Sequence, residues 1–576
     1  MITPDKRVSL KLIQLKKVLF FAGLAFFTPF ILFCVFYLVL GHGLLTRWYL
    51  SLNDCFYKRD SWSALFFTPQ TKSTGNILAL IGIAISVYFS LLIIIKKRKE
   101  EDLPITLSIS YRSLSWYGGV TVIALLLGTW SWSLASPAYD EVFSAVNCAE
   151  LHPFQTLSYY MLPNNHIYFN FLNNVLFSRL HNTIATGRLL SLLAYACVLI
   201  GAYHWLHVKI GKRLYALLGL LPIALQFMTW GLAAQARGYE LQLLCAWVSF
   251  ITLFRYLQTG STRLLKVNTL FCIVGFAMVS TYLHYFIAQL LFMLAVAVID
   301  KKMHWQFFKY QAYVVAVVFL LYLPALCFSG IPAFTANRYV IPAYANWHTF
   351  LPDFIDLLRY FINCCFSMLF GEDRVPNFVL FFLPLSLFFF PKKEQRLIAL
   401  FYVLLWAVFI VITLNMRRIP FTRNMILHFS LTMGIVVYTF YSLIQKAAAL
   451  LSVEKMKTIL VSTVFAIPVL CYCIYLAKTD RRDISHYIYC NDVNEIYTGH
   501  TKELAWIPPT ASIAFSDECF FLYYMFRKDH PNAHRCPTGQ EDYYIKRKDD
   551  PMPSERKDAY IKWRDGSEDY EYYVRR

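Results

Sequence analysis

The sequence predicts an all-α membrane protein with many spans and a small α/β domain at its C-terminus. Of its 576 residues, 58% are hydrophobic and only 15% are charged, whereas soluble domains have about 45–50% apolar and about 25% charged residues. Long apolar segments recur through the first 478 residues and then stop. This composition excludes a disordered chain, a collagen-like chain and a small disulfide-stabilised domain.

A helix needs about 20 mostly apolar residues to cross a bilayer. We expect about thirteen such helices, at residues 17–41, 76–95, 117–135, 187–206, 214–233, 238–257, 268–283, 285–300, 312–330, 378–390, 397–414, 425–444 and 458–478. The seventh and eighth are short and meet near His284. Basic residues flank this pair on both sides, which requires an even number of crossings. A single re-entrant segment would satisfy the same requirement.

Lysine and arginine divide the connecting segments into two sets. One set holds 25 of these residues in 88 positions: 1–17, 96–116, 207–213, 255–267, 301–311, 391–396 and 445–457. The other holds 12 in 147 positions: 42–75, 136–186, 234–237, 284, 331–377 and 415–424. Because basic loops stay in the cytoplasm, we expect a plasma (inner) membrane protein with its N-terminus inside and its C-terminus outside. The net charge of +19 then reports topology, and no nucleic-acid partner is expected.

This layout divides the chain into three parts. Residues 1–116 form a two-helix membrane extension, and residues 117–478 form the membrane core. Two large loops of that core, 136–186 and 331–377, lie outside. Residues 479–576 have no span and form an extracytoplasmic domain.

The composition of the C-terminal part is that of a small folded domain. We expect a strand at Ser512–Phe515 and a helix at Glu518–Phe526. Disulfides form in oxidising compartments, and several pairings are open to the three cysteines here, including Cys519 with Cys536.

The first candidate for chemistry is the acidic pair Asp140-Glu141, which follows Tyr139 soon after the third span. Only 17 Asp or Glu residues occur in the first 478 positions, so a carboxylate pair on the outer face is informative. Low-dielectric neighbours can raise a carboxyl pKa, which suits a general base. The alternative is an interfacial pair that caps the next helix.

The same loop continues with an amide-rich stretch that contains a histidine. Its members are Pro163, Asn164, Asn165, His166, Asn170, Asn173 and Asn174. Such a cluster can bind hydroxyl-rich ligands, and it can equally cap helices and fill turns.

Basic and ionisable residues recur at three later outer turns. Arg237 and Glu240 are spaced to pair on a helix, and arginine binds phosphate in a bidentate manner. His284 lies at the turn of the short helix pair, where a satisfied interfacial residue is the alternative. The turn that contains Arg417, Arg418 and Arg423 departs from the positive-inside rule, which indicates an anionic partner on that face.

No P-loop, dinucleotide-binding or zinc-protease motif occurs. If the acidic pair and the arginines converge on the outer membrane face, they fit a phosphate-linked lipid substrate.

In order along the chain, these motifs resemble the GT-C superfamily of integral-membrane glycosyltransferases. The resemblance is greatest to the branch of protein O-mannosyltransferases and the lipid A aminoarabinose transferase. It covers about residues 117–445, the GT-C-like core. The motifs are Asp140-Glu141, Pro163-Asn164-Asn165-His166, Gly187-Arg188-Leu189-Leu190-Ser191, Ala236-Arg237-Gly238-Tyr239, Leu283-His284-Tyr285-Phe286 and Arg423.

The resemblance implies that a sugar passes from a polyprenyl-phosphate-linked donor to an acceptor hydroxyl on the extracytoplasmic face, with inversion at the anomeric carbon. It implies that Asp140 is the general base and that Glu141 orients the acceptor or a cation. The candidates to bind the lipid phosphate and donor are Arg237, His284, Arg338 and Arg423. The candidates to contact acceptor or sugar are Tyr139, Asn165 and His166.

Some features depart from the superfamily pattern. The usual His-Pro-Pro stretch is replaced by Asn164-Asn165-His166, which leaves the role of His166 open. The spans at 17–41 and 76–95 precede the family core. Some relatives use a divalent metal, and metal dependence is open here. The acceptor could be a lipid, a glycan or a protein.

Two other functions compete with the enzyme. One is a transporter or a flippase for lipid-linked glycans, although transporters often contain internal repeats and none is visible here. The other is a polysaccharide polymerase, which would not need an acidic pair after an early span.

Overall fold

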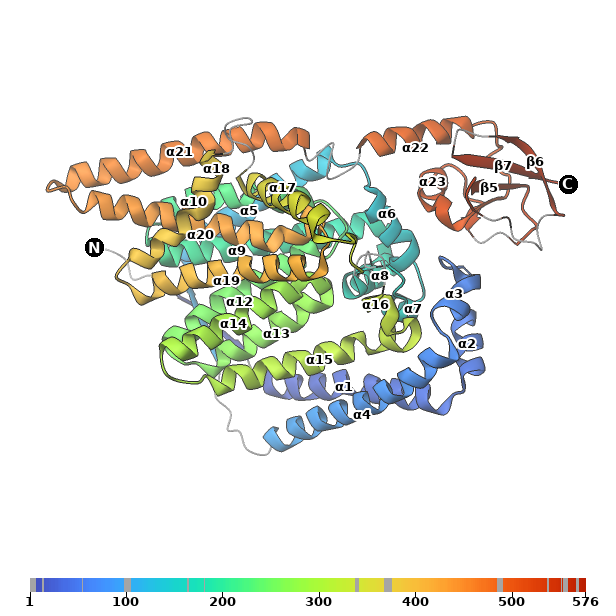
Figure 1. Ribbon diagram of the computed structural model, residues 1–576, viewed down its shortest axis with the longest axis horizontal. Coiled ribbons are helices and arrows are strands. Elements are labelled where there is room, and N and C mark those ends of the chain that lie inside the picture. The colour runs from blue at the N-terminus through green and yellow to red at the C-terminus, as the bar shows by residue number, and fades with distance from the viewer. Residues whose placement is uncertain are drawn as a thin grey trace.

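The computed structural model describes residues 7–12, 15–53, 55–97, 105–162, 165–180, 182–336, 341–366, 375–483, 491–535, 538–550, 552, 558–565 and 569–576. Structural statements below refer to these residues. A helical bundle forms the body of the molecule, with a helical N-terminal extension along one side and a small domain containing a sheet at one end (Figure 1).

Ten described helices are long and apolar enough to cross a membrane. They are α1 (Leu15–Val39), α4 (Pro69–Lys97), α5 (Tyr111–Leu134), α9 (Thr183–Ile210), α12 (Tyr239–Thr259), α14 (Leu283–Ile299), α15 (Trp305–Ser329), α19 (Lys393–Met416), α20 (Ile426–Ala448) and α21 (Glu454–Asp483). Each coincides with an expected span, so the all-α membrane fold is confirmed.

The other three expected spans are shorter helices. The segment 214–233 is divided into α10 (Arg213–Ala224) and α11 (Phe227–Leu232). The side chain of Gln226 caps α11 by accepting a hydrogen bond from the backbone of Thr229 at 3.1 Å, which starts a new helix inside the apolar run. The remaining two are α13 (Thr262–Met278) and α18 (Val375–Phe382), which is continued by a 3₁₀ stretch at Leu383–Phe389.

The helix pair around His284 is two separate helices. A 3₁₀ turn at Ser280–Tyr282 connects α13 to α14. A Cβ at Gly275 would lie 2.5 Å from the Tyr282 ring, so glycine allows the tyrosine to fold back against α13 at this turn.

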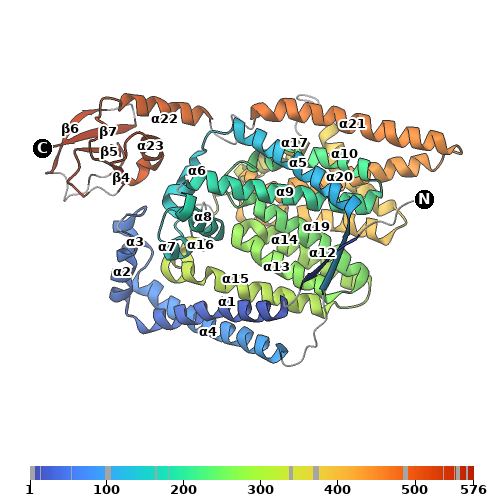
Figure 2. The same ribbon diagram turned by 180° about the vertical axis from the view of Figure 1, so that it is seen from behind.

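The N-terminal extension packs along one side of the core. Helix α1 packs against α4, and α4 packs against α15 (Figure 2). The hydroxyl of Tyr37 donates to the Cys327 carbonyl at 3.0 Å across this contact. Beyond α1 the chain forms α2 (His42–Ser51) and α3 (Arg59–Leu65). Strands β1 (Arg7–Leu12) and β2 (Ile105–Ser110) pair in antiparallel fashion.

The loop 136–186 is a compact set of helices. It contains α6 (Tyr139–Ser144), α7 (Pro153–Ser158) and α8 (Ile167–Leu180). The predicted amide cluster serves this packing: Asn174 donates to two backbone carbonyls at 2.7 Å each, and Asn173 donates to the Thr183 carbonyl at 2.9 Å. These asparagines therefore tie α8 to the backbone of neighbouring segments and have a structural role.

The C-terminal domain contains a five-stranded sheet in the order β4-β3-β5-β7-β6. Strand β3 (Ile513–Phe515) runs parallel to β4 (Ala533–Arg535) and β5 (Tyr543–Arg547). Strand β7 (Tyr570–Arg575) joins β5 to β6 (Tyr560–Asp565) in antiparallel fashion. Helices α22 (Asn491–Glu503) and α23 (Phe520–Phe526) accompany the sheet. The expected α/β domain, with its strand and helix, is confirmed.

One of the disulfide pairings that the sequence leaves open is not formed. Cys519 is a free, buried thiol, because its side chain points into the apolar core formed with Ile513, Phe515 and Leu522. The Cys519–Cys536 bridge is therefore not formed. Cys55, in the connection between α2 and α3, is disulfide-bonded.

Candidate functional site

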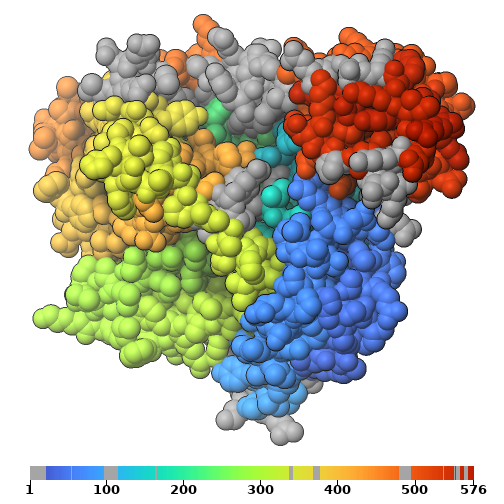
Figure 3. Space-filling model, turned by 45° about the vertical axis from the view of Figure 1, so that its right-hand side comes forward, coloured from blue at the N-terminus to red at the C-terminus, as the bar shows by residue number. Residues whose placement is uncertain are grey.

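A cavity of about 480 Å³ lies where the three parts of the chain meet. Its walls come from the α2–α3 connection, α6, the start of α12, the turn before α14, the turn after α19 and the start of α23. In Figure 3 the C-terminal domain (red) lies beside the N-terminal extension (blue), across a hollow from the yellow and orange helices. The site is thus assembled from segments far apart in sequence.

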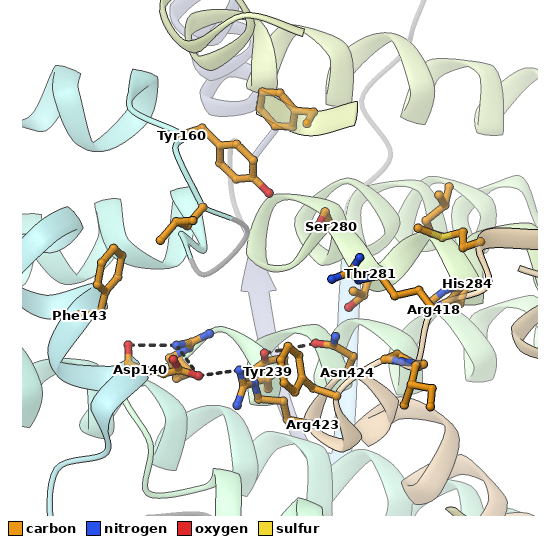
Figure 4. A pocket seen from close by; sticks show the side chains of 18 of the residues that line it. Asp140, Phe143, Tyr160, Tyr239, Ser280, Thr281, His284, Arg418, Arg423 and Asn424 are labelled. Carbon is orange, nitrogen blue, oxygen red and sulfur yellow. Dashed lines mark hydrogen bonds and ion pairs between the residues drawn. The ribbon is translucent and has the colours of Figure 1, made fainter. Parts of the chain in front are cut away.

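Three charged residues meet at the centre of this cavity. A guanidinium nitrogen of Arg423 lies 2.6 Å from Oδ2 of Asp140, and one of Arg237 lies 3.9 Å from the same oxygen. Arg237 also donates to the Asp140 carbonyl at 3.0 Å. Figure 4 shows Asp140 and Arg423 facing each other, with a dashed line for this ion pair. The side chains of Asp140 and Arg423 are each about one-third exposed, at 32% and 34%, so both can contact a ligand.

Glu141, the other half of the acidic pair, does not line the cavity. It is fully buried and makes a bidentate ion pair with Arg188, with both N–O distances at 2.8 Å. It also accepts hydrogen bonds from the backbone nitrogens of Ala236 at 2.7 Å and Ala138 at 3.2 Å. Glu141 therefore fixes three segments to one another, and this placement argues against direct contact with acceptor or cation.

Arg237 is held rigidly in the connection between α11 and α12. Only 2% of it is exposed. The next residue is Gly238. Glycine lets the backbone at this point lie close to the end of α13, because a Cβ there would lie 2.9 Å from the Met278 carbonyl oxygen. Glu240 does not form the predicted pair with Arg237. It is fully buried, and among the described residues its carboxyl oxygens have no hydrogen-bond partner.

His166 and Asn165 support the site from behind. Nδ1 of His166 accepts a hydrogen bond from the Gly238 backbone at 3.0 Å, and Nε2 lies 3.2 Å from Arg237. Burial and the guanidinium groups of Arg237 and Arg423 lower the pKa of His166 well below 6.5, so the ring is neutral. Asn165 is buried and bonds to the Tyr159 carbonyl and to Asn170. Neither side chain reaches the cavity.

The turn after α19 supplies further positive charge. Arg417 ends the helix in the left-handed conformation, at φ +43°, which turns the chain so that Arg418, Arg423 and Asn424 line the cavity. Asn424 accepts a hydrogen bond from Tyr239 at 3.3 Å. Arg418 and Arg423, two of the three arginines that depart from the positive-inside rule, thus face the same space as Asp140, whereas Arg417 donates to the Ala345 carbonyl at 2.7 Å.

The remaining predicted residues are distributed as follows. His284 and Tyr139 line the cavity, whereas Arg338 lies outside the described residues. Near His284 the wall becomes apolar, with Leu283, Ile412 and Met416.

Tyr57, Glu518 and Phe520 also line the cavity and were not found by sequence reasoning. Tyr57 belongs to the N-terminal extension and the other two to the C-terminal domain. No motif marks them, since they reach the site only through tertiary docking.

The described residues contain no group of three or more His, Cys, Asp or Glu side chains that could hold a metal. Arg237 and Arg423 pair with the Asp140 carboxylate, so its negative charge is already balanced without a metal cation. Metal dependence is therefore left without a candidate ligand set.

The cavity combines a carboxylate that can accept a proton with guanidinium groups that can bind an oxyanion. Its apolar wall can accommodate hydrocarbon. Together these groups could bind an anionic ester with an apolar tail and activate a hydroxyl beside it.

Comparison with known proteins gives structural similarity alone. No protein-family model and no curated protein matches the chain. The fold is similar to ArnT from Cupriavidus metallidurans bound to undecaprenyl phosphate, at 10% identity and a TM-score of 0.44, over 80% of this chain and 98% of that one. It is also similar to the oligosaccharyltransferase AglB from Archaeoglobus fulgidus, at 11% identity and a TM-score of 0.43, over 76% and 70%.

A third similar structure is the arabinosyltransferase EmbB from Mycobacterium smegmatis, at 10% identity and a TM-score of 0.43, over 71% of this chain and 45% of that one.

Proposed function

We propose that this protein transfers a sugar from a polyprenyl-phosphate-linked donor to an acceptor hydroxyl at the extracytoplasmic membrane face. The observation that supports it is the convergence of Asp140, Arg237 and Arg423 on one cavity. These residues come from three segments spread over almost 300 positions. A carboxylate lies beside two guanidinium groups in this cavity. This arrangement suits a reaction in which the carboxylate removes a proton and the guanidinium groups bind a leaving phosphate.

In the proposed reaction Asp140 accepts the proton of the acceptor hydroxyl. The hydroxyl oxygen attacks the anomeric carbon and forms the new glycosidic bond. The bond between that carbon and the phosphate oxygen breaks, and its electron pair remains on the polyprenyl phosphate. Attack opposite the leaving group inverts the anomeric centre. A positioned base contributes about 10²–10⁴-fold to such a step.

Arg237 and Arg423 stabilise the charge that develops on the leaving phosphate. Arginines that are fixed before the reaction lower its barrier, because no reorganisation is needed as the charge forms. Arg237 is fixed by burial and by its bond to the Asp140 backbone. Arg418 lies on the same side and extends the positive surface toward the phosphate.

The apolar wall around Leu283, Ile412 and Met416 would receive the isoprenoid next to the phosphate. His284 stands between this wall and the arginines. It could donate a hydrogen bond to the phosphate in its neutral form.

The test separates binding from chemistry. Native mass spectrometry of the purified protein should show bound undecaprenyl phosphate, and Arg423→Ala should weaken this binding about tenfold or more, since charge-assisted phosphate contacts are strong. Arg359→Ala is the matched control, because Arg359 is exposed on α17 (Trp347–Phe366) and pairs with Asp356. Equal binding by wild type and Arg423→Ala would remove Arg423 from a phosphate site.

The chemical step is tested with Asp140→Asn. Membranes supplied with a panel of undecaprenyl-phosphate-linked hexoses and pentoses should release undecaprenyl phosphate with the wild type. The variant should release it about 10²-fold more slowly or worse while still binding undecaprenyl phosphate. Wild-type release by Asp140→Asn would reject the base, and movement of the lipid across sealed vesicles without a new glycosidic bond would favour the transporter.

A further inference from the structure

One end of the cavity is aromatic and acidic, and the proposed reaction does not use it. This aromatic end consists of Tyr57, Tyr139, Phe143, Glu518 and Phe520. Figure 4 shows Phe143 and Asp140 on one side of the pocket, with His284 and Arg418 on the other. Arg418 thus lies away from the aromatic end, whereas Arg237 and Arg423 contact Asp140, which follows Tyr139 of that end.

The rings of the aromatic end pack on one another. The ring centroid of Phe520 lies 4.9 Å from that of Tyr139 and 5.2 Å from that of Phe143. Tyr57 contacts Phe143 at 5.4 Å. Phe520, Tyr57 and Phe143 are almost fully buried, whereas Tyr139 is partly exposed. The buried rings therefore support Tyr139, whose ring is offered to the cavity.

Among the described residues that line the cavity, two are acidic, Asp140 and Glu518. Glu518 is the one that belongs to the aromatic end. Its Oε1 accepts a hydrogen bond from the Tyr57 hydroxyl at 2.6 Å and lies 3.9 Å from Nζ of Lys58. Burial and Glu518 raise the pKa of Tyr57, so this hydroxyl stays a donor. Both contacts use one oxygen of a side chain that is 30% exposed, and the other oxygen can accept from a ligand.

Two parts outside the membrane core contribute Tyr57, Glu518 and Phe520 to the aromatic end, and contacts with neighbouring segments anchor them there. Arg527, directly after α23, makes a bidentate pair with Glu150, at 2.7 and 2.9 Å. Asp517 accepts a hydrogen bond from the Lys58 backbone at 2.7 Å. These contacts bring Tyr57 and Glu518 together in the same wall of the cavity.

We propose that the aromatic end is the acceptor subsite and that the acceptor is a carbohydrate. An aromatic ring offers an apolar face to the C–H groups of a sugar, and a carboxylate accepts hydrogen bonds from its hydroxyls. A pocket with several apolar groups and one directed polar group has the composition of a ligand site. The inference rests on the proposed function, because Asp140 must reach the hydroxyl of the bound sugar.

The experiment uses saturation-transfer-difference NMR on the full chain in nanodiscs with free saccharides: glucose, galactose, mannose, arabinose, N-acetylglucosamine and their common disaccharides. At least one should show contact with the wild-type protein. Glu518→Gln and Tyr57→Phe should each weaken this binding about fivefold or more, because the first replaces the carboxylate by a neutral amide and the second removes the hydroxyl that positions Glu518. Glu495→Gln is the control, since Glu495 is exposed on α22 of the same domain.

Absence of contact with every saccharide, or undiminished contact in both variants, would overturn the proposal. Undecaprenyl phosphate binding, measured in parallel on the same samples, distinguishes its failure from failure of the proposed function. If the lipid phosphate binds and no saccharide does, the donor assignment stands and the carbohydrate subsite is rejected. If a saccharide binds and the lipid phosphate does not, the cavity is a carbohydrate site without a donor, and the acceptor assignment is rejected together with the glycosyltransferase.

Discussion

Asp140 and Glu141 are adjacent in sequence and have opposite environments. Because α6 begins at Tyr139, consecutive side chains point about 100° apart around the helix axis. Asp140 consequently faces the cavity, and Glu141 faces the core and Arg188. Sequence reasoning assigned both to chemistry because it could not know where the helix begins. The position at which this short helix begins therefore determines which of the two carboxylates can reach a ligand.

The Glu141–Arg188 pair should matter for stability in a specific way. Removing one partner leaves the other charge buried and unpaired, which costs about 3–5 kcal/mol. We therefore expect Arg188→Met to lower the unfolding temperature of the purified protein strongly. Replacing both residues, with Glu141→Leu and Arg188→Met together, should recover much of the loss, since paired apolar side chains avoid the desolvation cost.

Thermal unfolding followed by intrinsic tryptophan fluorescence gives the comparison. The double variant also tests catalysis, because it removes Glu141 while keeping the fold. If the double variant were as unstable as Arg188→Met alone, the pair would not act as a unit.

His166 should make stability dependent on pH. Its pKa in the folded protein is lowered well below 6.5 by burial and by the guanidinium groups of Arg237 and Arg423. Below pH 6.5 the unfolded chain therefore binds a proton that the folded chain does not bind. The free energy of unfolding should fall as the pH is lowered from about 6.5, by up to about 1.4 kcal/mol for each pH unit.

His166→Asn provides the comparison, since the Asn oxygen can replace Nδ1 as acceptor for the Gly238 backbone. Unfolding temperatures measured between pH 7.5 and 5.5 should decrease less in this variant than in the wild type. Parallel curves for the two proteins would show that His166 is not the titrating group.

At the scale of elements, periodicity and length predicted most of the membrane fold. Ten expected spans are helices of sufficient length and apolarity. The interruptions were not predictable from hydrophobicity alone, because a cap such as Gln226 leaves the apolar pattern of 214–233 almost unchanged. Two turns at helix ends, which hold Arg237 and the stretch 418–424, contribute to the wall of the cavity, and hydropathy locates such ends only approximately.

Elements from different parts of the chain complete the site through contacts that carry no local signal. Tyr57 follows a surface helix, and Phe520 begins a helix in a separate domain. Their approach depends on docking contacts such as Arg527 with Glu150, 377 residues apart. A single sequence indicates the outer motifs of the core, where charge is scarce, and gives no information about a wall formed by docking.

At the scale of the whole molecule, the docking contacts constrain the membrane topology. Tyr57 lies beyond α1, so one crossing separates it from the N-terminus. The C-terminal domain contacts Tyr57 through Glu518 at 2.6 Å, and from this contact we predict that the domain lies on the side opposite the N-terminus. An odd number of crossings must therefore precede the domain. Ten long helices give an even number, so the three shorter helices α10, α13 and α18 must together supply an odd number of further crossings.

This argument predicts the behaviour of fusions expressed in bacteria. Alkaline phosphatase attached after Arg576 should be active and green fluorescent protein attached there should be dark, because phosphatase matures only outside the cytoplasm and the fluorescent protein only inside. The reverse should hold for fusions before Met1. The charge distribution of the loops favours the same orientation. A fluorescent C-terminal fusion would put the cavity in the cytoplasm, where a polyprenyl-linked donor used on the outer face could not reach Asp140.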